Sequence, residues 1–404
     1  MNNSTCSTHF EDSSYLSTLL YIVKIELHVH LDGSIRHETI WELSKTKGLR
    51  LPGNGTFQDL QTAMVIRDPK NLHHFLQPFL ISSPCLVGDL CAIERIAYEF
   101  CEDKAKNGVL YVEARYSPHL MFAKGEPCDI EAVSKVIQAV NRGHARGEAE
   151  FHIKVRSILC TLVGTNKALE VLQLCQKFRN EGVVGIDMAA PATVDPKHYV
   201  EVPEKGIEVK AFQKAAKLDI HRTVHAGESG SAEMVKRAIE IYKAERIGHG
   251  YHVLDNKAVY ETVRKQGIHL ENCPWSSYLT GSVPLAISKH PVVQFAEDRV
   301  NFSISTDDPM VTGYELQDDY DLVHKYWGLT EAHLIRAAVI HQLKDFSPST
   351  MNSIWTDESR MKVETVKALL QVKTNFDFSY EELSMKLYGN EQILKKIHSS
   401  DKYL

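Results

Sequence analysis

Four separate stretches of the chain contain residues that can bind a metal ion or transfer a proton. These residues are His28 and His30, His225 and Glu228, His249, and Asp307 and Asp308. Each set lies at the end of a short apolar run of the kind that forms a buried β-strand. In a barrel of parallel strands, the carboxyl ends of the strands meet at one mouth, and active sites lie there. The four stretches are therefore candidates for one shared site.

The His28 and His30 pair is the strongest local signal. The two residues alternate, so both imidazoles face the same side of a strand. The Asp32-Gly33 turn signal that follows places them at the carboxyl end of that strand. Taken alone, the pair fits two hydrogen-bonded core histidines as well as it fits a metal site. The three other strand ends favour the metal site, because chance placement of such a set is improbable.

Three imidazoles and one carboxylate form a donor set that suits Zn²⁺. A zinc ion with an open coordination position lowers the pKa of its bound water to about 7, which makes hydroxide available at neutral pH. Glu228 is placed to give a proton to the substrate, and His249 to orient or deprotonate the attacking water. We therefore expect a hydrolase with one zinc ion per chain.

Competing motifs are absent from the sequence. His269-Leu270-Glu271 matches the first half of the other zinc deaminase signature, but no Pro-Cys-x-x-Cys follows it. The eight cysteines include no Cys-x-x-Cys pair, which argues against a disulfide framework and against a cysteine zinc site. There is also no His-Glu-x-x-His, no P-loop and no Gly-x-Gly-x-x-Gly.

The elements that must position these residues alternate between strands and helices. Short runs rich in β-branched residues predict eight strands, at Lys24–His30, Val109–Arg115, Ile153–Leu159, Val183–Ala189, Ile220–His225, Arg246–His249, Ile268–Cys273 and Asn301–Thr306. Helical spacing lies between them, as in Ile93–Lys106, Lys167–Arg179 and Ala232–Lys243. This alternation predicts a parallel sheet. Eight strands predict a (β/α)₈ barrel of the TIM type, with extra helices over its carboxyl-terminal mouth.

The longest gap lies between the first two predicted strands. Within it, the segment Asn71–Ile81 carries an apolar stripe at helical spacing, formed by Leu72, Phe75, Leu76 and Phe79. Such a stripe is either an ordinary core-facing surface or an apolar lid over a site at the barrel mouth. The sequence alone leaves both interpretations open.

The composition is typical of a soluble globular protein, with 404 residues, 43% hydrophobic residues and 24% charged residues. A formal net charge of −6 argues against nucleic-acid or anionic-membrane partners, and no apolar run is long enough to span a bilayer. Residues 1–21 lack the basic start of a signal peptide, so we expect a disordered tail and a cytoplasmic location. We expect residues 22–340 to form the barrel, and residues 341–404 to form a helical segment packed on the same domain.

Seven stretches of the sequence closely resemble the adenosine deaminase family. They are residues 23–34, 111–120, 155–160, 221–228, 248–252, 273–281 and 305–309, which include Leu-His-Val-His-Leu-Asp-Gly, Thr-Val-His-Ala-Gly-Glu and Ser-Thr-Asp-Asp-Pro. They occur in the family order and cover most of residues 22–335. The segment after about Arg336 resembles the family only thinly. The combination is highly specific, and it implies the same barrel fold.

The resemblance implies a zinc site of His28, His30, His225 and Asp307. It also implies catalytic roles at this site for Glu228, His249 and Asp307. Glu228 would donate a proton to purine N1, and His249 would act on the zinc-bound water. The implied reaction converts adenosine and 2′-deoxyadenosine to inosine and deoxyinosine plus ammonia, in purine salvage.

The resemblance further implies the contacts to the small-molecule purine nucleoside. Asp308 would bond the N7 side of the purine, and Asp32 would hold the ribose 5′-hydroxyl. The main-chain amide of Ala190 would meet purine N3, and His30 would also lie against the substrate. The stripe Leu72, Phe75, Leu76 and Phe79 resembles the hydrophobic gate of the family.

The sequence departs from the family after Gly185-Ile186-Asp187. The family usually has an apolar residue followed by Ala-Gly-Asp-Glu, whereas Met188–Ala192 reads Met-Ala-Ala-Pro-Ala. Ala190 keeps an amide but adds a methyl group where close backbone approach is wanted, and Pro191 restricts the backbone. The loop Met121–Asp129 is also short. We expect these changes to affect purine affinity more than the chemistry.

Two alternative functions follow from these considerations. The first is a deaminase of a related 6-aminopurine or of a 5′-phosphorylated substrate. Asp32 argues against the phosphorylated substrate, because a carboxylate repels a phosphate. The second is a catalytically weakened purine-binding or interaction protein, which the Ala190-Pro191-Ala192 change suggests. The complete set of metal ligands and Glu228 argue against it.

Overall fold

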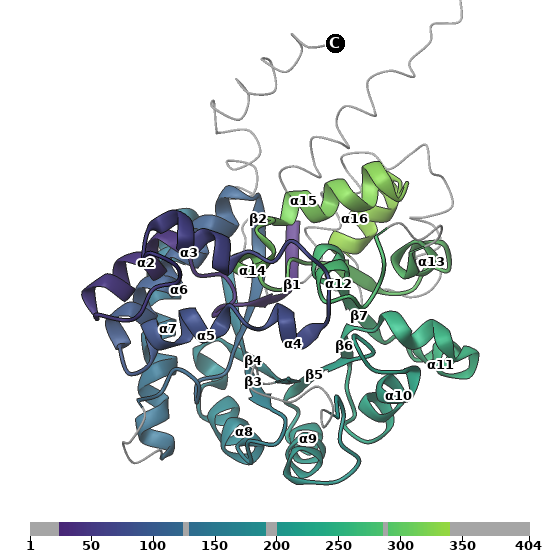
Figure 1. The fold of residues 1–404 in the computed structure, drawn as a ribbon. Coiled ribbons are helices and arrows are strands. Elements are labelled where there is room, and N and C mark those ends of the chain that lie inside the picture. Colours follow the sequence, from purple (N-terminus) through teal and green to yellow (C-terminus); the bar gives the residue numbers. More distant parts are fainter. Residues whose placement is uncertain (1–23, 124–128, 191–199, 286–289, 340–404) are drawn as a thin grey trace, which may run out of the picture. The chain divides into compact units, whose positions relative to one another are not determined.

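The computed structural model describes residues 24–123, 129–190, 200–285 and 290–339 (Figure 1). Eight parallel strands follow one another in the sheet in sequence order. They are β1 (Lys24–His30), β2 (Val109–Tyr116), β3 (Lys154–Leu162), β4 (Val183–Ala189), β5 (His221–Ala226), β6 (Arg246–His249), β7 (His269–Asn272) and β8 (Phe302–Ile304). The predicted strands are confirmed, and their ends differ from the structure by only a few residues.

The sheet closes just beyond the end of β8. Val29 pairs with Asp307 in a parallel bridge. The amide of Asp307 donates to the carbonyl of His28 over 3.0 Å, and the amide of His30 donates to the carbonyl of Asp307 over 2.8 Å. This confirms the predicted (β/α)₈ barrel. It also brings the first and last strand ends together, so that residues far apart in the sequence share one mouth.

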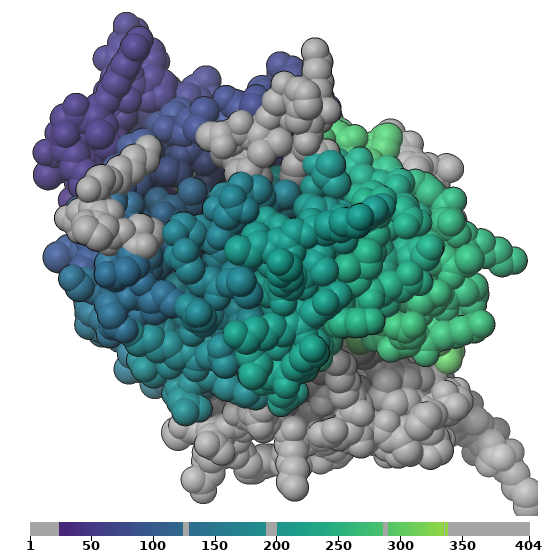
Figure 2. Space-filling model, turned by 90° about the horizontal axis from the view of Figure 1, so that it is seen from below, coloured from purple at the N-terminus to yellow at the C-terminus, as the bar shows by residue number. Residues whose placement is uncertain are grey.

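Helices connect the strands on the outside of the barrel. The β1–β2 connection contains α2 (His37–Thr46), α3 (Phe57–Met64), α4 (Leu72–Phe75), α5 (Phe79–Leu86) and α6 (Leu90–Lys106). Later connections contain α7 (Ile130–Phe151), α8 (Ala168–Lys177), α9 (Ile207–Lys217), α10 (Ala232–Glu240), α11 (Lys257–Gln266), α12 (Pro274–Leu279) and α13 (Pro291–Glu297). After β8 come α14 (Pro309–Thr312), α15 (Leu316–Asp321) and α16 (Glu331–Val339). In the space-filling view the colours of the described residues follow the sequence order around the barrel, so consecutive strand–helix units lie side by side (Figure 2).

Local sequence explains where several helices begin. Asp89 and Asp129 precede α6 and α7, and each side chain accepts a hydrogen bond from a backbone amide of the first turn. Asn256 does the same for α11. These helices then bury one apolar face, as in α6, where Ile93, Ile96 and Phe100 are buried. Burial of such a face holds each helix against its neighbours.

The apolar stripe at helical spacing in Asn71–Ile81 does not lie on one continuous helix. The segment belongs to two short helices, α4 and α5, and the break comprises Leu76, Gln77 and Pro78. Proline has no amide hydrogen, and it disfavours helical geometry in the residue before it. The side chain of Asn71 caps α4 by accepting from the amide of His74. The short α4 lies over the strand ends, in place of an ordinary long helix of the outer layer (Figure 1).

The expected N-terminal tail (1–21) and C-terminal helical segment (341–404) lie outside the described residues, so both stay predictions. Within the described ranges, none of the helices is both long enough and apolar enough to cross a membrane.

Candidate active site

A cavity of about 530 Å³ opens at the carboxyl ends of the strands. Its inner end is polar and is lined by His30, Asp32, His225, Glu228, His249, Asp307 and Asp308. Its outer wall is largely apolar and includes Leu72, Phe75, Leu76, Phe79, Leu80, Val87, Leu120, Leu162, Ala189 and Ala190. All the site residues predicted from the sequence therefore meet at this cavity, except His28, which is fully buried beside it.

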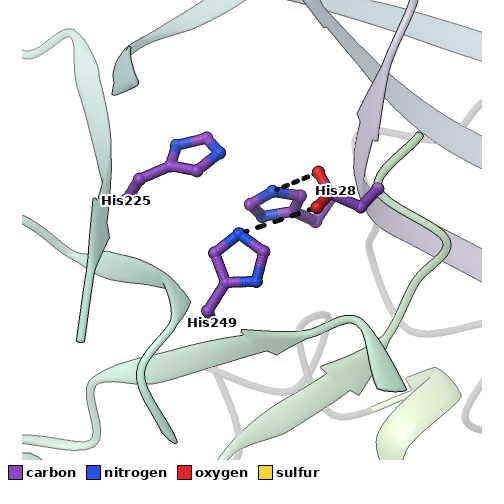
Figure 3. Close-up of side chains that lie close together, drawn as sticks. His28, His225 and His249 are labelled. Carbon is purple, nitrogen blue, oxygen red and sulfur yellow. Dashed lines mark ion pairs between the residues drawn. The ribbon is translucent and has the colours of Figure 1, made fainter. Parts of the chain in front are cut away.

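Four buried groups form a cluster that can hold a metal ion. They are His28, His225, His249 and Asp307, and their ligand atoms all lie within 4.8 Å of one another (Figure 3). Nε2 of His28 lies 3.3 Å from Oδ1 of Asp307. His30, which the family pattern puts in the metal set, is close by, with Nε2 3.3 Å from Oδ1 of Asp307 and 3.3 Å from Nε2 of His225. His30 also forms a second group with Asp307 and Asp308.

His28 and His225 differ from His249 in that a carboxylate contacts the Nδ1 atom of each ring. Nδ1 of His28 lies 2.7 Å from Glu271, and Nδ1 of His225 lies 3.1 Å from Asp187. A carboxylate on Nδ1 fixes the ring and leaves Nε2 as the ligand atom, which is typical of metal-binding histidines. Nε2 of His28 is indeed buried without a hydrogen-bond partner among the described residues. In His249 the unpartnered buried atom is Nδ1, so this ring lacks the same support.

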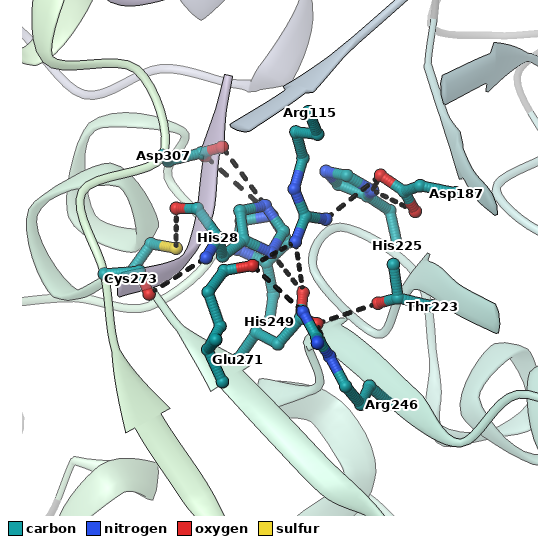
Figure 4. A network of polar contacts seen from close by, with 12 residues as sticks. His28, Arg115, Asp187, Thr223, His225, Arg246, His249, Glu271, Cys273 and Asp307 are labelled. Carbon is teal, nitrogen blue, oxygen red and sulfur yellow. Dashed lines mark hydrogen bonds and ion pairs between the residues drawn. The ribbon is translucent and has the colours of Figure 1, made fainter. Parts of the chain in front are cut away.

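A buried charge network lies beneath the cluster (Figure 4). Arg115 on β2 donates to Glu271 over 2.8 Å and to Asp187 over 3.0 Å, so one guanidinium contacts both carboxylates. Arg246 on β6 also donates to Glu271. Burial raises the pKa of Glu271, but the charges of Arg115 and Arg246 outweigh it and hold that pKa well below its usual range. Burial also raises the pKa of Asp187, but the charges of His225 and Arg115 outweigh it and hold that pKa below its usual range. Both carboxylates that support the imidazoles are therefore anionic.

Sequence reasoning missed this network. From the sequence alone, Glu271 is identified only as half of an unrelated motif, Arg115 only as part of a matching stretch, and Asp187 only as the residue before the departure from the family pattern. The available signal was a charged residue inside an apolar strand, which is costly unless the charge is paired.

Glu228 follows β5 in the loop that leads to α10. Its side chain is buried, and Oε1 has no hydrogen-bond partner among the described residues. Oε2 lies 3.7 Å from Nε2 of His249. Burial, and then the nearby charge of Asp307, raise the pKa of Glu228 well above its usual range. A carboxyl group that keeps its proton near neutral pH is suited to act as a general acid.

Two further carboxyl groups face the cavity from the neighbouring turns. Burial, and then the charges of Asp307, Asp32 and Glu228, raise the pKa of Asp308 well above its usual range. Burial raises the pKa of Asp32 to about 6. Each has a buried oxygen without a partner among the described residues. A Cβ atom at Gly33 would lie 1.7 Å from Oδ1 of Asp308, so only glycine leaves this carboxyl in place.

Two residues of the site have a strained backbone. His249 and Asp307 have φ values of 66° and 65°, in the left-handed region that residues with a side chain rarely adopt. Hydrogen bonds hold both residues there. The side chain of Asn272 donates to the carbonyl of His249 over 2.6 Å, and the strand contacts that close the barrel hold Asp307. Strain of this kind persists where the surrounding structure enforces it, and it clusters at functional sites.

The apolar stripe of α4 and α5 faces the cavity, as the lid interpretation requires. Leu72, Phe75, Leu76 and Phe79 all line it, although α4 and α5 are separate helices. Leu80 is 52% exposed, so the wall extends outward to the solvent.

The segment that departs from the family pattern is only partly described. Ala190 lines the cavity, whereas Pro191 and Ala192 lie outside the described residues. Residues 124–128 of the short loop Met121–Asp129 also lie outside them.

Comparisons with known proteins agree with one another. The family model described as "Adenosine deaminase" matches residues 23–350. The adenosine deaminase of Xenopus tropicalis is 43% identical over 336 residues, covering 81% of this chain and 92% of the relative. The corresponding Clostridium perfringens protein is 32% identical over 313 residues, covering 77% of this chain and 90% of the relative.

Solved structures show the same fold. An adenine deaminase from Arthrobacter aurescens has a TM-score of 0.70 at 22% identity, and the match covers 85% of this chain and 99% of that one. Arabidopsis ADAL complexed with IMP has a TM-score of 0.67 at 23% identity, over 88% of this chain and 99% of that one. At these identities the likeness concerns the fold alone.

Proposed function

Because the chain belongs to the adenosine deaminase family, we propose how its own residues carry out the family's reaction and on which substrates. The protein is an enzyme that deaminates adenosine by hydrolysis. The proposal adds 2′-deoxyadenosine as a second substrate, one zinc ion as the cofactor, and a place in cytoplasmic purine salvage. The single observation that carries it is that Glu228, buried and unpartnered at Oε1, lines the same cavity as the His/Asp cluster.

His28, His30, His225 and Asp307 would hold the zinc ion. The carboxylates behind His28 and His225 support this assignment, because they direct the two Nε2 atoms toward one point. Oδ2 of Asp307 accepts from Ser276 over 2.7 Å, while Oδ1 faces the two histidines of β1. A bound zinc ion supplies a Lewis acid that makes a water molecule nucleophilic near neutral pH.

Glu228 and His249 are the proposed proton-transfer residues. Burial, the largest influence, lowers the pKa of His249 well below its usual range, so the ring is neutral and can accept a proton from the attacking water. Glu228 gives its proton to purine N1 as the water oxygen bonds to C6. His249 passes the proton taken from the water to the C6 amino group, the C6–N bond breaks and ammonia leaves. The remaining hydroxyl proton returns to Glu228, so the product carries a carbonyl oxygen at C6 and a hydrogen on N1.

The purine is oriented by groups along its edge. Purine N7 is a hydrogen-bond acceptor, and the raised pKa of Asp308 leaves it protonated and able to donate. The amide of Ala190 is the proposed donor to N3, and Asp32 is the proposed acceptor of the 5′-hydroxyl. The stripe formed by Leu72, Phe75, Leu76 and Phe79 would cover the bound nucleoside and exclude water.

The lining of the cavity favours nucleosides over 5′-monophosphates. Among the described residues that line it there is no lysine or arginine, whereas Asp32 adds a negative charge at its inner end. A phosphate group placed there would lose its hydration without gaining a cation. The structure solved with IMP is therefore similar to this chain in its fold, and its ligand does not identify the substrate of this chain. A weakened binding protein is disfavoured, because all the proposed catalytic groups are present.

The test measures the change in ultraviolet absorbance as the purified protein converts adenosine, 2′-deoxyadenosine or AMP, with and without a chelator. We expect conversion of both nucleosides, little conversion of AMP, and loss of activity after chelation. Equal efficiency on AMP, or full activity in a metal-free protein, would contradict the proposal.

A further inference from the structure

The loop that carries Glu228 is held by a second glutamate from another part of the chain. Glu201 lies between β4 and α9, and its side chain is buried. Oε2 accepts a hydrogen bond from the amide of Gly227 over 2.8 Å. Oε1 accepts from the amides of Glu228 over 3.1 Å and Ser229 over 3.3 Å. Consecutive amides that converge on one carboxylate form an anion-binding nest.

The loop needs such support because glycines flank the catalytic residue. Gly227 has a φ of 68°, in the left-handed region, and Gly230 ends the turn. Glycine is flexible, so a turn with glycine on both sides of Glu228 has many alternative conformations. Charge-assisted hydrogen bonds to three successive amides remove most of them. The fit is close, since a Cβ atom at Gly230 would lie 2.3 Å from Oε2 of Glu201.

The segment that carries Glu201 is itself fixed to the helix that follows the loop. Arg237 of α10 donates to the carbonyl of Val202 over 3.3 Å and pairs with Glu204 at 2.6 Å. The hydroxyl of Tyr242 donates to the carbonyl of Pro203 over 2.9 Å. Two hydrogen bonds and an ion pair therefore connect the Glu201 segment to α10 and to Tyr242, which follow the Glu228 loop in the chain.

We propose that Glu201 is a positioning residue for catalysis, which acts by holding the backbone of Glu228 so that its carboxyl meets the substrate. Glu201 does not line the described cavity and does not touch the reacting atoms. The inference rests on the proposed function, because it takes Glu228 to be the proton donor. Misplacing a catalytic group by about 1 Å can cost on the order of 100-fold in rate.

The substitution Glu201→Gln tests this directly. Glutamine keeps the size of the side chain but has only one acceptor oxygen. In the variant, the NH₂ group therefore faces a backbone amide that donates to a carboxylate oxygen in the wild-type protein. We expect kcat for adenosine to fall about 10- to 100-fold, with KM and the metal content per chain little changed. Lys205→Gln is the control, since Lys205 belongs to the same segment and is exposed. The control should keep wild-type kcat.

A second substitution covers the case in which Glu201→Gln fails to fold. Gly230→Ala leaves Glu201 intact but places a methyl group against its carboxylate. It should lower kcat in the same selective way, and Tm measurements on both variants show that the fold is kept. Unchanged kcat in folded Glu201→Gln or, where that variant does not fold, in Gly230→Ala would overturn the proposal, as would a fall in kcat that tracks loss of bound metal.

A double substitution separates positioning from a general structural role. If Glu201 acts only through Glu228, adding Glu201→Gln to Glu228→Gln should lower the residual turnover by less than about threefold. A full additional loss would show that Glu201 acts by another route. Wild-type and Glu228→Gln proteins in the same assay separate the two claims. Normal turnover in Glu228→Gln would remove the proposed function, and with it this inference, whereas normal turnover in Glu201→Gln alone would remove only the inference.

Discussion

The inner end and the outer wall of the cavity are built in opposite ways. At the inner end, His28 and His225 are each fixed by a buried carboxylate, and the backbone of His249 and Asp307 is held in a strained conformation. The outer wall is largely apolar and is formed by side chains of α4, α5 and the neighbouring loops and strand ends, and Leu80 is half exposed.

This difference separates two tasks. Groups that act on the reacting atoms must be held in place before the substrate arrives, because small errors in position are costly. Apolar side chains that cover a bound ligand contribute through burial, which depends little on direction. Changes at the inner end should therefore reduce kcat or metal binding, whereas changes toward the outer wall should alter KM.

Glu228→Gln should have the largest effect. The amide keeps the shape of the side chain but cannot give up a proton as the carboxyl group does, so we expect kcat to fall about 10²- to 10⁴-fold. Metal content and much of the substrate binding should remain, since Glu228 is outside the proposed ligand set. Steady-state kinetics with elemental analysis would check this, and near-normal turnover would show that the assigned role is wrong.

Gly248→Ala should disturb the metal site without changing any ligand. A Cβ atom there would lie 2.7 Å from Cε1 of His28, whose ring cannot withdraw because Glu271 holds it. We expect metal affinity, measured by chelator competition, to fall about 10- to 100-fold. Gly267→Asn is a suitable control, because that position is open and asparagine tolerates its left-handed backbone. Unaltered affinity in Gly248→Ala would mean that His28 is not a ligand.

Asp32→Asn should narrow the preference for adenosine over AMP by on the order of tenfold. The substitution removes the charge that opposes a phosphate and weakens the contact to the 5′-hydroxyl. The same narrowing should occur in the wild-type protein as the pH falls through about 6, where Asp32 takes up a proton. The second pKa of a phosphate is also about 6, so the pH series needs the Asn variant beside it. A preference that is unchanged in the variant would rule out this role for Asp32.

Ala190→Gly should have the smallest effect. Removing the methyl group lets the backbone approach the purine edge. We expect KM to fall by the factor that corresponds to about 1 kcal/mol of binding free energy, with kcat little changed. The added flexibility of glycine offsets part of this gain. If KM stays the same or rises, the segment does not contact the purine as proposed.

Sequence patterns predicted most of the fold because the barrel strands are short β-branched runs with clear ends. They predicted the site because its residues lie at those ends, where a closed barrel brings them together. The break between α4 and α5 was missed, although Pro78 was a visible reason for it. The helical spacing of the stripe outweighed that signal.

Other features had no local signal at all. Glu201 contacts a loop 26 residues further along the chain, and Arg115 contacts Glu271 across 156 positions. No periodicity or spacing reports such pairs, because they form only when the barrel closes. The structure also places His249 within the tight cluster, whereas the family pattern assigns it to the water.

The central claim is that the inner cluster holds one zinc ion that the deamination requires. The most direct measurement is elemental analysis of protein purified without added metal, combined with adenosine turnover before and after chelation. We predict about one zinc per chain, loss of turnover on its removal, and recovery when zinc is restored. A stoichiometric amount of a different metal, or full turnover in protein without metal, would contradict it.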